Sequence, residues 1–175
     1  MRKLRTFELG RLSQEQYKEK KKKPIIVVLD QVRSGNNVGS IFRTSDALLV
    51  NSIYLCGITA VPPSNDIHKT ALDAEKTVHW EYFAHTGDAI AILKEHKYKV
   101  YAIEQVEGSI LLPDFQPSEN DNIALIFGNE VKGVQQNIID LCDGCIEIPQ
   151  FGTKHSFNVS VSAGIVLWDI TNKLK

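Results

Sequence analysis

The chain has 175 residues, of which 43% are hydrophobic and 23% charged, and its formal net charge is −1. These values describe a single soluble globular domain that is long enough for a sizeable core. The sequence contains no apolar run of membrane-spanning length and no signal peptide, so we expect no membrane partner. Three cysteines, an odd number, fit reduced thiols in the cytoplasm.

The charge is unevenly distributed along the chain. Residues 1–23 contain nine Lys and Arg residues against three Glu residues, a balance of +6, so the remainder carries −7. We therefore divide the chain into a basic N-terminal arm, residues 1–23, and one domain, residues 24–175. A basic arm on an acidic body indicates contact with a polyanion such as RNA, although lysine runs are also typical of solvated tails. Both interpretations stay open.

The first predicted strand is the continuous apolar run at residues 24–30, which is typical of a strand covered on both faces. A loop of turn residues follows at 31–37. From Val38 the apolar residues recur with helical spacing, and Asn37 is the expected N-cap of this helix. Arg43 lies off the apolar face, and we expect its side chain to lean back toward the loop.

The rest of the chain alternates between strand and helix patterns. Further strands are predicted at 52–56, 78–84, 99–104, 123–127 and 146–148. Helices are predicted at 69–74, from a cap at Thr86, at 134–141 and from about Val159. Residues 108–122 are predicted to be a polar connector. This alternation predicts an α/β fold, an open and mostly parallel sheet with flanking helices.

Three loops that follow predicted strands are rich in glycine and polar residues: 31–37, 128–133 and 150–156. Ligands bind beyond the carboxyl ends of the strands in sheets of this kind, so these loops form the candidate site. Ser156 and Asn158 fall at the start of the last helix, where the first-turn N–H groups lack partners within the helix.

The same loops carry three motifs of a known family. Residues 37–43 (NVGSIFR) match the N-x-G-x-x-x-R first motif of the SpoU (TrmH-like) branch of SPOUT RNA methyltransferases, and residues 127–134 and 148–160 resemble its second and third motifs. The resemblance implies methyl transfer from S-adenosylmethionine to a ribose 2′-hydroxyl of tRNA or rRNA, with tRNA slightly favoured. It also implies a C-terminal trefoil knot and a homodimer with its site near the interface.

The resemblance assigns roles to individual residues. Arg43 matches the catalytic arginine and Asn37 the residue that orients it, Glu130 matches the second-motif acid, and Ser156 and Asn158 match the polar pair of the third motif. The residues implied for the cofactor are Ile103, Gly128, Ile148, Ser156 and Phe157. Three positions depart from the family pattern, and these are Asp73, Gln150 and Phe157.

The role of Arg43 has more than one interpretation. A guanidinium stays charged in proteins, so we favour a phosphate clamp that stabilises charge on the 2′-oxygen over a general base. Arg43 paired with Asp46 on the surface is the structural alternative. For the whole protein, the alternative is a non-catalytic RNA-binding or ribosome-assembly protein on the same fold. Cys142 and Cys145 have the spacing of a redox motif, but they lie between a helix end and a strand start, whereas a redox pair would open a helix, so buried thiols are expected. No metal site is predicted.

Overall fold

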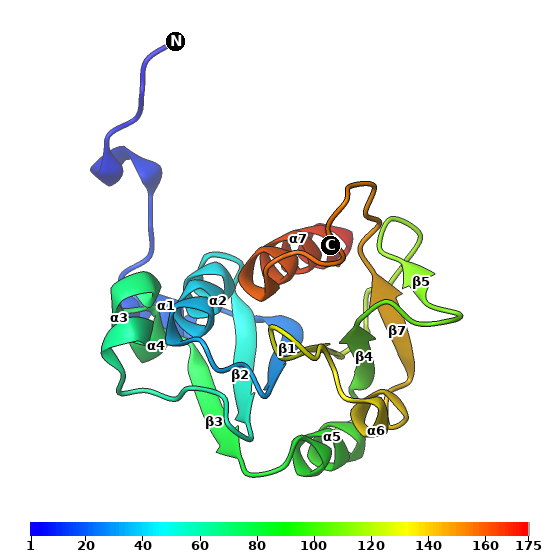
Figure 1. Cartoon of the computed structure of the whole chain (residues 1–175). Coiled ribbons are helices and arrows are strands. Elements are labelled where there is room, and N and C mark those ends of the chain that lie inside the picture. Colours follow the sequence, from blue (N-terminus) through cyan, green and yellow to red (C-terminus); the bar gives the residue numbers. More distant parts are fainter. Residues whose placement is uncertain (175) are drawn as a thin grey trace.

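The computed structural model of the chain, shown in Figure 1, describes residues 1–174 apart from the side chains at positions 6 and 7. Within these residues, seven strands form one sheet in the order β3-β2-β1-β6-β4-β7-β5, and all neighbouring pairs are parallel. The strands are β1 (Lys23–Asp30), β2 (Val50–Cys56), β3 (His79–Phe83), β4 (Lys99–Ile103), β5 (Ile110–Leu111), β6 (Ile123–Phe127) and β7 (Gly144–Glu147). The predicted α/β fold class is confirmed.

Helices cover both faces of the sheet, which explains the continuous apolar runs of its central strands. On one face α2 (Gly35–Ala47) and α7 (Val159–Lys173) pack over residues such as Val27 and Leu125. On the other face α5 (Thr86–Glu95) and α6 (Gln136–Ile139) pack over residues such as Val28 and Ile126. None of the helices in residues 1–174 is long and apolar enough to cross a membrane.

The register of the central strands brings their carboxyl ends to one edge. Leu29 of β1 lies opposite Phe127 of β6, and Ala102 of β4 lies opposite Ile126 of β6. The loops that leave these three strands therefore begin at nearly the same level of the sheet. This edge is where ligands bind in open α/β folds.

Two predicted helix caps differ in the structure. Helix α2 starts three residues earlier than expected, because the hydroxyl of Ser34 accepts a hydrogen bond from the N–H of Asn37 at 3.3 Å. Asn37 is therefore inside the first turn and is not the N-cap. Thr86 is the first residue of α5 rather than its cap, and its hydroxyl donates to the buried carboxylate of Asp30 at 2.6 Å. Of the two polar residues expected at the start of α7, Asn158 is the N-cap, and its side chain accepts from the N–H of Ser160 at 2.9 Å.

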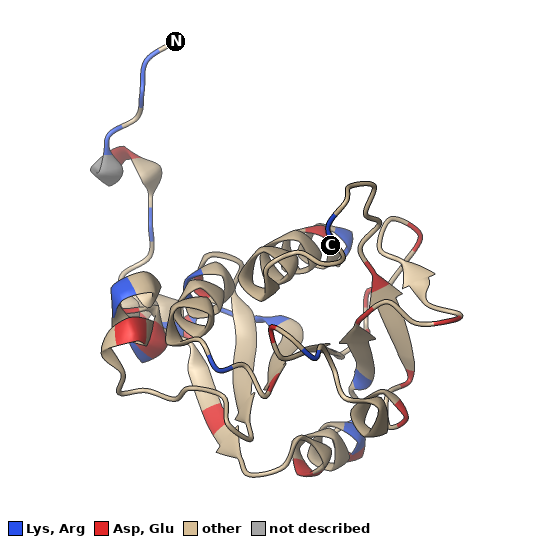
Figure 2. Cartoon of the chain, in the orientation of Figure 1, with Lys and Arg blue, Asp and Glu red and all other residues tan. Residues whose placement is uncertain are grey.

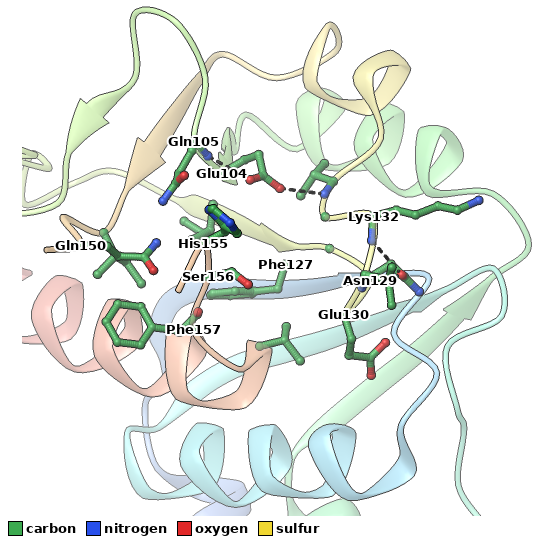
Figure 3. A pocket seen from close by; sticks show the side chains of 18 residues that line it. Glu104, Gln105, Phe127, Asn129, Glu130, Lys132, Gln150, His155, Ser156 and Phe157 are labelled. Carbon is green, nitrogen blue, oxygen red and sulfur yellow. Dashed lines mark hydrogen bonds between the residues drawn. The ribbon is translucent and has the colours of Figure 1, made fainter. Parts of the chain in front are cut away.

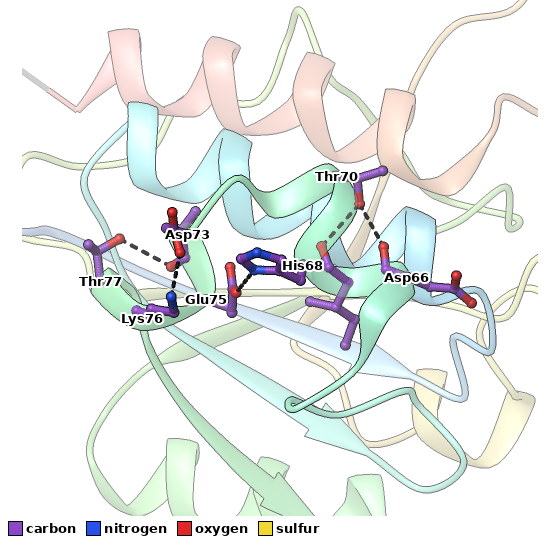
Figure 4. A network of polar contacts seen from close by, with 9 residues as sticks. Asp66, His68, Thr70, Asp73, Glu75, Lys76 and Thr77 are labelled. Atoms are coloured by element: carbon purple, nitrogen blue, oxygen red, sulfur yellow. Dashed lines mark hydrogen bonds and ion pairs between the residues drawn. The ribbon is translucent and has the colours of Figure 1, made fainter.

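The helix predicted at 69–74 is two short helices, α3 (Asn65–Ala71) and α4 (Ala74–Thr77). Leu72 and Asp73 break it with φ values of 53° and 71°, in the left-handed region that favours glycine. Asp73, which departs from the family pattern, therefore holds a conformation that glycine adopts without strain. The Asp73 carboxylate pairs with Lys76 at 2.5 Å within the polar network of Figure 4. The predicted connector 108–122 also contains a short strand, β5.

The basic N-terminal segment has two parts. Residues 1–9, which include the 3₁₀ helix η1 (Thr6–Leu9), project away from the body and carry several basic residues, as Figures 1 and 2 show. Helix α1 (Gln14–Glu19) instead packs on the body, and its Tyr17 is only 5% exposed within the core. The ring of Tyr17 also lies 4.0 Å from the Lys22 ammonium. The projecting part is therefore the portion that is free to contact another molecule.

Candidate functional site

A pocket of ≈ 340 Å³ opens at the carboxyl ends of β4, β6 and β7 (Figure 3). The loops that follow these three strands line it, together with the first turn of α7. All five residues that the resemblance implies for the cofactor lie on its wall: Ile103, Gly128, Ile148, Ser156 and Phe157. Segments that are far apart in the sequence thus form one cavity of the size that holds a small-molecule ligand.

The β6 loop is a tight turn that only glycine permits at position 128. Asn129 and Gly133 exchange backbone hydrogen bonds of 3.1 and 2.9 Å. A Cβ atom added to Gly128 would lie 2.1 Å from the carbonyl carbon of Gly133 and 2.2 Å from the nitrogen of Val134. The side chain of Asn129 also accepts from the N–H groups of Val131 and Lys132. The pocket wall is therefore built from closely packed backbone.

Beside the pocket, one residue from each predicted motif joins a hydrogen-bonded chain. The Glu130 carboxylate accepts from the Asn37 side-chain amide at 3.2 Å and from the Ser34 N–H at 2.9 Å. The carbonyl oxygen of the Asn37 side chain accepts in turn from the Asn158 amide at 3.1 Å. The carboxylate thus fixes the orientation of the Asn37 side-chain amide, with its nitrogen toward Glu130 and its oxygen toward Asn158. Asn37, Glu130 and Asn158 are brought together as predicted from the three loops.

The environment of Glu130 keeps its side chain charged. Partial burial raises the pKa of the carboxyl, but hydrogen bonds from Ser34, Asn37 and Arg33 outweigh this effect, and the pKa lies below its ordinary value. Both carboxylate oxygens accept from the segment 33–37. This geometry makes Glu130 an orienting residue for Asn37, which in turn contacts Asn158 of the third motif.

Arg43 does not join this group within the chain, so the expectation that it leans back toward the loop is wrong. It lies six residues after Asn37, which places it about 120° around the helix and about 9 Å along it. Its side chain is exposed and lines a different pocket, of ≈ 690 Å³, together with Arg11 and Asp46. Asp46 accepts from the Thr77 hydroxyl, and no ion pair of Arg43 occurs among the described residues.

The sequence reasoning missed several residues that line the first pocket: Glu104, Gln105, Asn129 and Lys132. Of these, Glu104 could most easily have been predicted, because it directly follows an apolar strand pattern, and site residues occur at this position in parallel sheets. Asn129 stands inside a recognised motif, but its role depends on a turn that the pattern does not specify.

Two sets of titratable side chains lie outside the candidate site. Burial raises the pKa of the Cys56 and Cys142 thiols to about 12, so both are protonated and unreactive at neutral pH. The side chains of His68, Asp73 and Glu75 each have a possible metal-ligand atom, and these atoms lie within 4.8 Å of one another. In the structure the Glu75 carboxylate is hydrogen-bonded to His68, and Asp73 is paired with Lys76 (Figure 4).

Comparison with known proteins bears on both the fold and the motifs. Residues 24–168 match the model of the SpoU rRNA Methylase family. The chain is 31% identical over 144 residues to the 23S rRNA (guanosine-2′-O-)-methyltransferase RlmB of Neisseria meningitidis, which covers 82% of this chain and 56% of the relative. It is 30% identical to the tRNA (guanosine(18)-2′-O)-methyltransferase of Thermus thermophilus, over 89% of this chain and 78% of the relative.

Among solved structures, the AdoMet-bound rRNA methyltransferase from Sinorhizobium meliloti superimposes with a TM-score of 0.80 at 26% identity, covering 89% of this chain and 58% of that one. The chain thus spans little more than half the length of two of these proteins. The family match nevertheless extends over most of the chain and includes all three motif loops. The chain therefore belongs to the SpoU rRNA Methylase family.

Proposed function

We propose that this chain transfers a methyl group from S-adenosylmethionine to a ribose 2′-hydroxyl of tRNA or rRNA. The observation that carries the proposal is that the second and third motif loops line one pocket, and that Asn37 of the first motif is joined to Glu130 and Asn158 beside it. The relatives named above are 2′-O-methyltransferases of rRNA and tRNA, and the S. meliloti structure holds AdoMet. A cytoplasmic location and a family-type trefoil knot belong to the same proposal.

The pocket fits S-adenosylmethionine in its chemistry. Ile103, Ile148 and Phe157 supply apolar surface for an adenine ring, and the backbone of the Gly128 turn supplies polar groups that a side chain at that position would obstruct. The bound cofactor supplies an activated methyl group. The residues of this chain hold the acceptor in line with that methyl group, because positioning is the larger part of such a transfer. Asn37 and Asn158 present their amides for this purpose.

The same proposal includes a homodimer that completes the site. The exposed face of α7 carries Val161 and Trp168, which are 49% and 64% exposed, and an apolar groove of ≈ 570 Å³ runs beside Trp168. Exposed apolar surface of this kind marks protein interfaces. Because Arg43 points away from the pocket of its own subunit, we propose that it acts at the pocket of the partner subunit.

Calorimetry and a methyl-transfer assay test the function directly. We expect the protein to bind S-adenosylmethionine and to transfer a labelled methyl group to tRNA or rRNA transcripts, with tRNA tried first. Transfer to the 2′-oxygen makes the adjacent phosphodiester resistant to alkali, which identifies the product. If the protein binds both cofactor and RNA and no transfer occurs with either RNA class, the non-catalytic alternative is correct.

The projecting basic segment is proposed to contact the RNA backbone. Deleting residues 1–23 would also remove the buried Tyr17, so charge substitution is the cleaner test. We expect the double variant Lys3→Gln, Arg5→Gln to reduce the slope of log K against log salt for RNA binding by about 1.5 to 2. The matched control, Lys94→Gln with Lys97→Gln, changes two lysines in and just after the last turn of α5, before the amino end of β4, and should leave the slope unchanged. If the wild type, the double variant and the control show the same salt slope, the segment does not contact the RNA and is a solvated tail.

A further inference from the structure

Glu104 forms a link between two walls of the pocket. It follows β4, and its backbone N–H donates to Ile146 of β7 at 3.2 Å. Its carboxylate then reaches to the loop after β6, where one oxygen accepts from the Val134 N–H at 3.0 Å. The other oxygen accepts from the N–H of Gln105 at 3.0 Å. Figure 3 shows this side chain extending from the end of β4 toward the neighbouring loop.

The carboxylate also fits closely against the loop that it holds. A Cβ atom added to Gly133 would lie 2.1 Å from a Glu104 carboxylate oxygen, so the acid occupies the space beside a glycine with φ of 65°. Val134 is 5% exposed, and its N–H would lack a partner from the protein if the acid were removed. An unpaired buried N–H is costly, which gives the link a definite energetic effect.

The β6 loop is fixed from two sides by different side chains. On the side of β1, the Asn129 amide donates to the carbonyl of Gln31 at 2.8 Å. On the side of β4, the Glu104 carboxylate holds Val134. These two links hold the turn from Gly128 to Gly133, which lines the pocket. The shape of the wall therefore depends on Glu104 as much as on residues within the motif itself.

We propose that Glu104 is a positioning residue for the cofactor, which holds the β6 loop in the conformation that binds S-adenosylmethionine. The proposal rests on the proposed function, since it names a determinant of the same pocket. Figure 3 shows Glu104 and Glu130 apart from each other on the pocket wall, and Asn37 and Asn158 are joined to Glu130. Loss of Glu104 should consequently affect cofactor affinity and leave RNA affinity and the chemical step intact.

The test compares three variants by calorimetry with S-adenosylmethionine. For Glu104→Ala we expect a cofactor Kd about tenfold higher than that of the wild type. In Glu104→Gln the amide oxygen still accepts from Val134, so the Kd should return to within about threefold of the wild type. The control Glu107→Ala removes an exposed acid three residues away and should not change the Kd. At saturating cofactor, Glu104→Ala should methylate RNA with a kcat near the wild-type value, so that only the KM for the cofactor rises.

The outcomes separate this proposal from the proposed function. If the wild type fails to bind S-adenosylmethionine, the proposed function is wrong. If the wild type binds it and Glu104→Ala binds equally well, the positioning role is wrong. The role is also wrong if Glu104→Gln, with a thermal midpoint equal to that of the wild type, binds no better than Glu104→Ala, or if kcat falls with the KM unchanged.

Discussion

Replacing Arg43 with alanine is expected to lower kcat for RNA methylation by about a thousandfold, with an unchanged Kd for S-adenosylmethionine. Bound S-adenosylmethionine would supply the methyl group, and the 2′-hydroxyl would pass its proton to the neighbouring phosphate, so that negative charge develops on the oxygen that accepts the methyl group. A guanidinium that clamps the neighbouring phosphate stabilises this charge and holds the ribose in line. Arg43 is absent from the wall of the proposed cofactor pocket, so cofactor binding should not respond.

The substitution Arg43→Lys distinguishes the geometry of the clamp from its charge. Lysine keeps the positive charge but cannot form the two parallel hydrogen bonds of a guanidinium. We expect this variant to recover little of the lost turnover. Lys69→Ala, which removes an exposed positive charge on α3, is the control and should keep wild-type kcat. Wild-type turnover in Arg43→Ala would remove Arg43 from the mechanism.

The sheet was predictable because its signals are local and strong. Residues 24–29 and 123–127 are apolar throughout, and parallel strands covered on both faces have this composition. The strand β5 was not predictable from periodicity, because two exposed residues in a polar connector carry no such signal. Its pairing with β7 depends on the tertiary position of the connector.

The site was predictable only in part, for a reason that lies in one helix cap. Both Ser34 and Asn37 are good N-cap residues, and the pattern alone does not choose between them. The structure uses Ser34, so Asn37 enters the first turn and the angle between Asn37 and Arg43 is set by helix geometry. Three motif loops could be expected to meet at the edge of the sheet. The direction of the Arg43 side chain could be predicted only if the first residue of α2 was known.

Replacing Gly128 with alanine is expected to raise the Kd for S-adenosylmethionine by about a hundredfold, because the new methyl group collides with backbone that cannot yield independently. The contacts of 2.1 Å to Gly133 and 2.2 Å to Val134 force the turn to open, and this turn lines the pocket. Gly152→Ala is the matched control, since a Cβ there meets nothing within 4 Å. Equal cofactor affinity in the two variants would contradict the assignment of this turn to the cofactor.

The two variants together decide which subunit supplies Arg43. Arg43→Ala keeps an intact pocket, whereas Gly128→Ala keeps an intact arginine. When chains with different tags are co-expressed and heterodimers are isolated through both tags, an arginine acting on the partner's pocket restores one of the two sites, so activity should reach about half that of the wild-type dimer. An arginine acting within its own subunit restores none, because each chain then lacks one essential part. Heterodimers as inactive as the two parent variants would therefore show that α2 must reorient when RNA binds.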